Sequence, residues 1–316
     1  MRWSGKVGSL FLLPAVIWVL VFTIFPLGYS LYLSLHNVTS KVEVVGREEV
    51  PVLDADGNPV LKPNGEPRTR TEVIRELNRT FTWNDFANYG RAFRDGQVRD
   101  AAVFTGIFVV AGVVIEIVLG LVLAYLFNRP IIGRGLMRSI MILPIFATPI
   151  AIGYLFFTVF YEEGGPLQWT GLPWLSDPTM AKISVILVDI WQWTPFCFLV
   201  FLAALQGIPD EQIESARLDS NSNWDLWKTV ILPALKPIII IVGLLRLAEA
   251  LKLFDIIATL TKGGPGTATQ SYTYYAYTAG FKLQDYGYAS ALAFLLLIVV
   301  MVIVTFFFRF LRRTYE

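Results

Sequence analysis

The sequence predicts an all-α membrane protein with six transmembrane helices, a cytoplasmic helix between the fourth and fifth, and a long external connection after the first. Of its 316 residues, 55% are hydrophobic and only 16% are charged, which is too apolar for a soluble domain of this length. The apolar residues also form long blocks, and a helix needs about 20 of them to cross the hydrocarbon layer. Six blocks qualify: Ser9 to Leu35, Ala101 to Phe127, Leu136 to Phe160, Ile183 to Leu205, Val230 to Ile257 and Tyr288 to Phe308.

The first block follows Arg2 and Lys6, as the apolar part of a signal peptide does. However, it exceeds the usual length of about 7 to 15 residues, and no small-x-small cleavage site follows Leu35. We therefore expect a retained helix.

Basic residues near the helix ends predict the orientation, because cytoplasmic connections carry an excess of Lys and Arg. One set of connections is rich in them: Arg2, Lys6, Arg129, Arg134, Arg138, Arg217, Lys228, Arg309, Arg312 and Arg313. The short connections on the other side hold only Lys182, Lys262 and Lys282. Both termini are therefore expected in the cytoplasm.

The connection over residues 37–100, between residues 1–36 and the helices of 101–316, is expected outside although it is basic, since long loops escape the charge rule. Short apolar runs there alternate with turn dipeptides, which suggests a small β-hairpin. The group Asp54, Asp56, Gly57 and Asn58 resembles part of a calcium loop. It lacks the remaining ligands and the terminal Glu, so turn chemistry is the favoured interpretation.

Several function classes are disfavoured by composition. The net charge of +1 gives no reason to expect nucleic acid. With single Cys197 and single His36, neither a disulfide framework nor the usual metal-ligand clusters are expected, and no catalytic residues are proposed. No G-x-x-x-x-G-K-[ST] phosphate loop occurs, so any ATP hydrolysis belongs to another chain.

The segment from Ile208 to Pro233 predicts a short helix over residues 209–222 on the cytoplasmic side. Pro209 with acidic residues in the first turn favours a helix start, and Ser220 to Ser222 favour its end. A helix of about ten polar residues does not fold alone. We expect a partner, approached closely at Ala216 and through polar contacts of Glu214 and Arg217.

These residues resemble the coupling helix of membrane subunits of ATP-binding-cassette importers, whose pattern is Glu-Ala-Ala, three residues, Gly, nine residues and Ile-x-Leu-Pro. Glu214, Ala216, Val230, Leu232 and Pro233 match this spacing. Ser215 and Ser220 replace the first Ala and the Gly. The resemblance assigns ATPase coupling to one group of residues: Glu214, Ser215, Ala216, Arg217, Asp219, Ser220, Leu232 and Pro233.

A second stretch, Leu260 to Thr269, is similar to the signature of sugar and glycerol-3-phosphate permeases. The stretch reads Leu-Thr-Lys-Gly-Gly-Pro-Gly-Thr-Ala-Thr, and the similarity continues at Tyr277, Phe281, Gly287 and Ala291, with Asn88 and Tyr89 earlier in the chain. By itself, Gly263 to Pro265 fits a plain turn equally well.

The resemblance implies a bacterial inner-membrane permease that works with other subunits. An ATPase dimer that holds ATP and Mg²⁺ would grip the coupling helix, a second permease would pair with this one, and an external binding protein would deliver solute. The solute would be carbohydrate-like: a sugar, a polyol or a glycerol phosphate. Because basic and acidic residues balance in the fifth helix, a neutral saccharide is favoured.

Ionisable residues inside membrane helices cost about 2.5–3.5 kcal/mol each on insertion scales and usually face a cavity or a partner. Arg246, Glu249, Lys252 and Asp255 recur every third residue, so they form either a self-neutralising ladder of i,i+3 pairs or part of a solute path.

In the fourth helix, aromatic and polar residues suit a carbohydrate site or an interfacial anchor. These are Asp189, Trp191, Gln192 and Trp193. Glu116, alone in its helix, is expected to pair with another helix.

Three hypotheses remain: the importer subunit, a self-contained ion-coupled carrier or channel, and a membrane-embedded enzyme. The coupling-helix spacing favours the first, and the scarcity of His and Cys disfavours the third. The requirement for an ATPase partner separates the first two.

Overall fold

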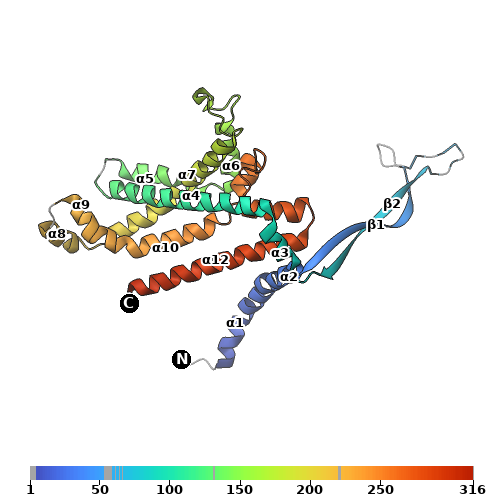
Figure 1. Cartoon of the computed structure of the whole chain (residues 1–316), viewed down its shortest axis with the longest axis horizontal. Helices are drawn as coiled ribbons and strands as arrows, with labels where there is room; N and C mark the ends of the chain where they lie inside the picture. Colours follow the sequence, from blue (N-terminus) through green and yellow to red (C-terminus); the bar gives the residue numbers. More distant parts are fainter. Residues whose placement is uncertain are drawn as a thin grey trace. The chain divides into compact units, whose positions relative to one another are not determined.

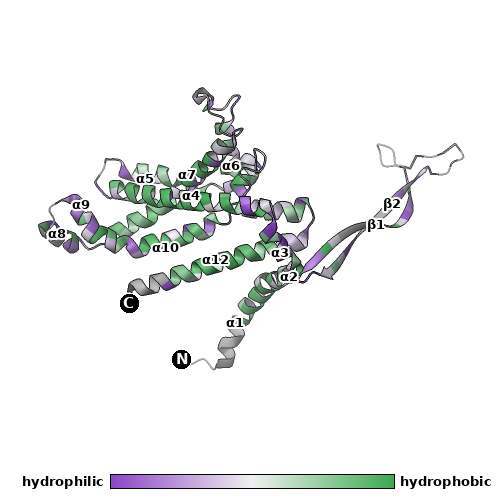
Figure 2. Ribbon diagram, viewed as in Figure 1, coloured by the Kyte–Doolittle hydropathy of each residue, from purple (hydrophilic) through white to green (hydrophobic). Residues whose placement is uncertain are grey.

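The computed structural model describes residues 5–52, 59–60, 62–63, 65, 67–130, 132–219 and 222–315 (Figure 1). The chain divides into two compact units: Met1–Arg91 with Ala279–Ala291, and Ala92–Thr278 with Leu292–Glu316. Hydrophobic residues dominate the long helices, whereas hydrophilic residues are interspersed along the hairpin strands (Figure 2). The chain is thus mostly helical, as predicted, but it is not all-α, because the first unit also contains two long strands.

Five helices in the described residues are long and apolar enough to span a membrane. They are Leu12–Ser34, Gly96–Phe127, Pro178–Gln206, Asn223–Ala250 and Tyr286–Arg309. The first span joins α1 (Gly5–Val19), η1 (Leu20–Ile24) and α2 (Phe25–Ser34). The second and third spans are α4 and α7, and the fifth lies in α12 (Tyr286–Tyr315). The fourth span joins α9 (Asn223–Leu226), η4 (Trp227–Ile231) and α10 (Leu232–Ala250). Four of the six expected spans thus agree with the sequence prediction to within a few residues.

The expected third span, Leu136 to Phe160, is not one helix. Instead, α5 (Arg134–Ile142) with η2 (Leu143–Phe146) and α6 (Pro149–Phe160) form a pair bent by 103°. The cause is Pro149, because the residue before a proline avoids the helical region. Thr148 accordingly has an extended backbone, and its hydroxyl accepts a bond from the N–H of Ala151 that caps α6. If the bent pair counts as one span, the total is six.

The expected fifth span, Val230 to Ile257, is also interrupted. α10 ends at Ala250, and a new helical stretch leads into η5 (Ile257–Thr261) only after a break at Leu253 and Phe254. The carbonyl freed at Leu253 accepts hydrogen bonds from the Ser271 and Thr273 hydroxyls. These two side chains replace the backbone partner that a continuous helix would supply.

The first unit contains a long antiparallel hairpin of β1 (His36–Pro51) and β2 (Thr69–Trp83), of 16 and 15 residues. Pairing runs from His36 opposite Trp83 to Pro51 opposite Thr69, with a bulge between Val44 and Gly46. Alternating polar and β-branched residues favour these strands. The hairpin is therefore much longer than the small one suggested by the turn dipeptides. The Asp54, Asp56, Gly57 and Asn58 group lies outside the described residues.

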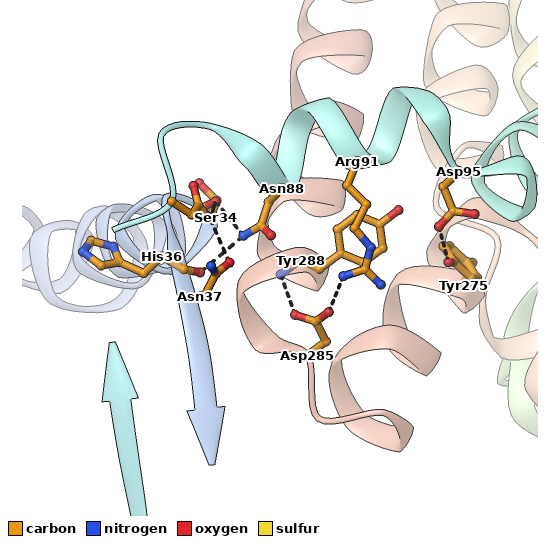
Figure 3. A network of polar contacts seen from close by, with 10 residues as sticks. Ser34, His36, Asn37, Asn88, Arg91, Asp95, Tyr275, Asp285 and Tyr288 are labelled. Carbon is orange, nitrogen blue, oxygen red and sulfur yellow. Dashed lines mark hydrogen bonds and ion pairs between the residues drawn. The ribbon is translucent and has the colours of Figure 1, made fainter. Parts of the chain in front are cut away.

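Hydrogen bonds and an ion pair hold the end of the hairpin where β1 begins (Figure 3). The Asn88 amide, on α3 (Ala87–Arg94), donates to the carbonyls of Ser34 and His36 at 3.1 and 3.3 Å. Arg91 pairs with Asp285 at 2.6 Å, and Asp285 in turn accepts the N–H of Tyr288 at the start of α12. A side chain at Gly287 would collide with the His36 carbonyl, which explains the need for glycine there.

In the second unit, α4 (Gly96–Phe127), α7 (Pro178–Gln206) and α10 pack against one another. Their shared core includes Phe198, Phe201 and Leu235. Close approach of α4 and α7 requires a glycine: a Cβ added at Gly120 would lie 2.5 Å from the Cys197 Cβ atom. The cysteine is thus part of the packing seam between the two helices.

The connection between α6 and α7, which contains η3 (Gln168–Thr170), is organised by Glu162. Its carboxylate accepts from the N–H groups of Leu175 and Ser176, both at 2.8 Å, and from the Ser176 hydroxyl at 2.7 Å. The Leu175 bond above all holds the pKa of Glu162 below its ordinary value. This stabilisation is therefore present above the pKa of the unfolded chain and is lost as the pH falls through the lower pKa of the folded state.

We expect Gly120→Ala to lower stability by about 1–3 kcal/mol, because the new methyl group overpacks the seam between α4 and α7. The matched control is Gly106→Ala on the same helix, where an added Cβ has nothing within 4 Å. It should be neutral or slightly stabilising, since alanine favours helix. Thermal unfolding of both variants in detergent, followed by tryptophan fluorescence, measures the difference. Equal melting temperatures would contradict the tight seam.

Candidate functional site

A pocket of about 200 Å³ in the second unit is lined by α4, α6, α7, α10 and the broken stretch after α10. Seven of the eight residues predicted for a solute path line it: Asp189, Gln192, Trp193, Arg246, Glu249, Lys252 and Asp255. The sequence prediction did not include Phe108 and Pro149, which also line the pocket. The only signal for Pro149 is the proline itself, which breaks the helix and brings its turn to the pocket wall.

Buried ionic contacts join three helices beside this pocket. The Arg246 guanidinium on α10 donates from Nε and Nη2 to the two Glu116 oxygens on α4, at 2.6 and 2.9 Å. Its Nη2 also reaches Asp189 on α7 at 2.9 Å. Relative exposures are 1% for the Arg246 side chain, 0% for Glu116 and 5% for Asp189. The expectation that Glu116 pairs with another helix is confirmed.

The pairing partners correct the expected ladder of i,i+3 ion pairs. Arg246 pairs across helices, and only Glu249 and Lys252 form the i,i+3 contact, at 2.7 Å with half-exposed side chains. Asp255 begins a separate helical stretch beyond the break, so it does not continue a stripe on α10. The physical reason is desolvation: a buried guanidinium needs several acceptors around it, and two carboxylates from neighbouring helices supply them.

The pocket wall also combines an aromatic face and an amide. The Arg246 guanidinium lies over the Trp193 ring at 4.4 Å from its centre, which is a cation–π contact. Gln192 is 3% exposed, and its Oε1 atom has no hydrogen-bond partner in the described part of the chain. Because unpaired buried polar atoms are costly, this oxygen is a ready acceptor for a ligand.

Trp191 is the predicted path residue that the structure places elsewhere. It lines an apolar recess of about 890 Å³ among α4, α5, α6 and α7. Successive residues on a helix are about 100° apart, since 3.6 residues make a turn. Trp191 and Trp193 therefore lie on different faces of α7. The sequence prediction had assigned both of them to one solute path.

The predicted coupling segment forms α8 (Asp210–Asp219), followed by α9, whose first turn is capped by the Ser222 hydroxyl bonding to the N–H of Asp225. In Figure 1 both lie at the end of the second unit where α4 ends. α8 presents two faces. Ile213 and Ala216 pack inward against the core of α4, α7 and α10, whereas Glu214, Ser215 and Arg217 are exposed. Ser220 lies outside the described residues.

Large apolar side chains are exposed beside these residues. Leu218 is 89% exposed and Trp224 is 75% exposed. Leu232 and Pro233, at the start of α10, are exposed as well, and Pro233 suits the first helical turn. Ala216 is half-buried and packs against the core of its own chain, and its neighbours form most of the outward surface.

Comparison with known proteins decides the family. Residues 116–315 match the family described as "Binding-protein-dependent transport system inner membrane component". The chain belongs to this family. The match includes Glu116, α7, α8 and α10, and therefore the whole pocket wall except Phe108, as well as the exposed surface of α8 and α9.

Individual proteins similar to this chain support the same family assignment. A probable ABC transporter permease, y4oQ of Sinorhizobium fredii, is 37% identical over 66% of this chain and 69% of its own length. The trehalose/maltose transport permease MalF of Thermococcus litoralis is 31% identical over 92% and 89%. A bacterial ABC transporter for alginate import has the same fold, with 22% identity, a TM-score of 0.75 and coverage of 98% and 96%.

The chain is therefore a multi-pass inner-membrane permease subunit of an ABC importer. In this family ATP is hydrolysed by a separate subunit, so the chain itself is not an enzyme. These relatives give no support to a self-contained ion-coupled carrier. Within the described ranges, no group of three His, Cys, Asp or Glu residues could hold a metal ion.

We expect Arg246→Met to destabilise the permease by about 3–5 kcal/mol, because it leaves two carboxyl groups buried without their cation. Adding Glu116→Gln should recover part of the loss, since one buried charge is removed. Lys252→Met is the matched control: its ion pair is half-exposed, so the change should stay within about 1 kcal/mol. Thermal unfolding of the detergent-solubilised variants provides the measurement. A loss at Lys252 as large as at Arg246 would refute this account.

Proposed function

We propose that this chain forms, with a second six-helix permease, the path by which a carbohydrate or polyol-like solute enters the cell at the expense of ATP. The pocket between α7 and α10 carries this proposal. It combines an aromatic ring, a buried amide and ion pairs, which are the groups that bind hydroxyls and sugar faces. Relatives named for trehalose/maltose and lactose transport point the same way.

The small volume of the pocket supports a solute path that is shared with the second permease. Its volume of about 200 Å³ falls below the roughly 300–1,000 Å³ usual for a complete small-molecule site. It would therefore hold one part of a solute, and the second permease would contribute the rest.

An ATPase dimer holding ATP and Mg²⁺ would dock on α8 and α9. The support is the exposed apolar surface of Leu218 and Trp224, flanked by the charged Glu214 and Arg217. Two large apolar side chains exposed on neighbouring short helices, one of them a tryptophan, fit the anchors of a protein interface. This assignment makes α8 a coupling helix and places it and both termini in the cytoplasm. The hairpin of residues 36–83 is then external, where a solute-binding protein would deliver its cargo.

We expect Trp224→Ala to weaken binding of the ATPase subunit about tenfold or more, because truncating an interface anchor typically costs about 2 kcal/mol. The matched control is Trp169→Ala, an equally exposed tryptophan at 82% that is expected on the external side. Co-purification and surface plasmon resonance with the isolated ATPase subunit report the affinities.

Solute-stimulated ATP hydrolysis by the complete complex gives an independent test with Glu214→Ala. We expect hydrolysis to become uncoupled from solute while the permease keeps its melting temperature. If the isolated chain instead moves solute in liposomes without any ATPase subunit, the importer proposal is wrong.

A further inference from the structure

The polar groups that line the pocket of Asp189, Gln192 and Arg246 are mostly hydrogen-bond acceptors. Gln192 Oε1 is buried and has no partner in the described residues, although the residue lines the pocket. Asp189 Oδ2 accepts a hydrogen bond from Arg246 at 2.9 Å. An acceptor-rich wall is best matched by a ligand that brings donors.

The two basic residues of the wall are already engaged. Arg246 donates to Glu116 and Asp189, and the face of its guanidinium is covered by Trp193. Lys252 is paired with Glu249 at 2.7 Å. An anionic ligand would therefore have to compete with Glu116, Asp189 and Glu249 for these two cations.

One carboxylate in the pocket wall, that of Asp255, has no cation as a partner in the described part of the chain. Asp255 is half-buried, lines the pocket, and forms no ion pair or side-chain hydrogen bond with the described residues. Of the charged wall residues outside the buried Arg246 group, Glu249 and Lys252 pair with each other, so Asp255 is the acid without a cation within the described ranges. An unpaired carboxylate in the pocket wall favours a cationic ligand over an anionic one.

We propose that the pocket selects an amino-sugar unit, whose protonated amine pairs with Asp255 and whose other donors bond to Gln192 Oε1. The inference rests on the proposed import of a carbohydrate and adds the charge of its substrate. Phe254, which also lines the pocket, supplies an aromatic surface suited to a sugar ring or an ammonium group. Trp193 holds Arg246 in place and thereby keeps that cation away from the incoming amine.

Three disaccharides with the same β-1,4 linkage separate charge from shape. One is built of glucosamine, one of N-acetylglucosamine and one of glucose, so only the first is cationic. The complete complex in lipid nanodiscs, without the external binding protein, is titrated with each sugar by calorimetry. We expect the glucosamine disaccharide to bind about tenfold or more tightly than the other two, as a charge-assisted hydrogen bond allows.

Asp255→Asn should abolish this preference, lowering affinity for the glucosamine disaccharide about tenfold while changing affinity for the two neutral sugars less than about twofold. The control is Glu163→Gln, an exposed acid on the connection after α6 that does not line the pocket. It should leave all three affinities unchanged. Because the preference is first measured on the unaltered chain, the proposal does not depend on the folding of either variant.

Equal binding of the three sugars, or a preference for a neutral one, would overturn the inference. Repeating the titration in potassium chloride and in choline chloride of equal ionic strength distinguishes a sugar amine from an inorganic cation. A preference present in choline but absent in potassium would assign the site to the metal ion and also overturn it.

Transport assays separate this inference from the proposed function. ATP-driven import of the glucose disaccharide with no preference for the amine would leave the importer standing and the charge selectivity refuted. Selective binding of the amine without ATP-driven import would do the reverse.

Discussion

The contacts of Arg246 with Glu116 and Asp189 constrain the whole second unit. They join α10 to α4 and α7, and every member of the group is almost fully buried. Such a group does not tolerate sliding of one helix past another, because any displacement would leave a charge without its partner in a medium that offers no water. It also fixes the position of the guanidinium over Trp193, and so shapes one wall of the pocket.

The two breaks in the membrane helices free backbone polar groups that need new partners. The bend before α6 and the interruption after α10 both expose backbone, and both lead directly to pocket-lining residues, Pro149 and Leu253 to Ile256. Irregular backbone is tolerated at membrane depth only where protein or a cavity surrounds it. Ser271 and Thr273 satisfy the freed Leu253 carbonyl, so the interruption is a supported part of the site.

Local features of the sequence were sufficient to predict most spans, the helix at α8 and seven pocket residues. Hydropathy, turn residues and helix-start residues act within a few positions of one another, so they are visible without the fold. Partner choice is not local. Arg246 had a suitable acid three residues away at Glu249, yet it pairs with Glu116 and Asp189, which only helix packing brings near. Likewise, hydropathy predicted one continuous span where the helix pair is bent by 103°, and it grouped Trp191 with Trp193 although the two line different pockets.

Two helices connect the proposed ATPase surface to the pocket. The inner face of α8, through Ile213 and Ala216, rests on a core that includes Phe198 of α7 and Leu235 of α10. The same helices continue to Gln192 and Arg246, and eleven residues from Leu235 to Arg246 span about 16 Å at 1.5 Å per residue. A displacement of α8 by a docked ATPase would therefore act on both walls of the pocket through rigid helices. Since the buried ion pairs hold α7 and α10 to α4, the three helices would move together, and opening would occur at the surfaces that the second permease completes.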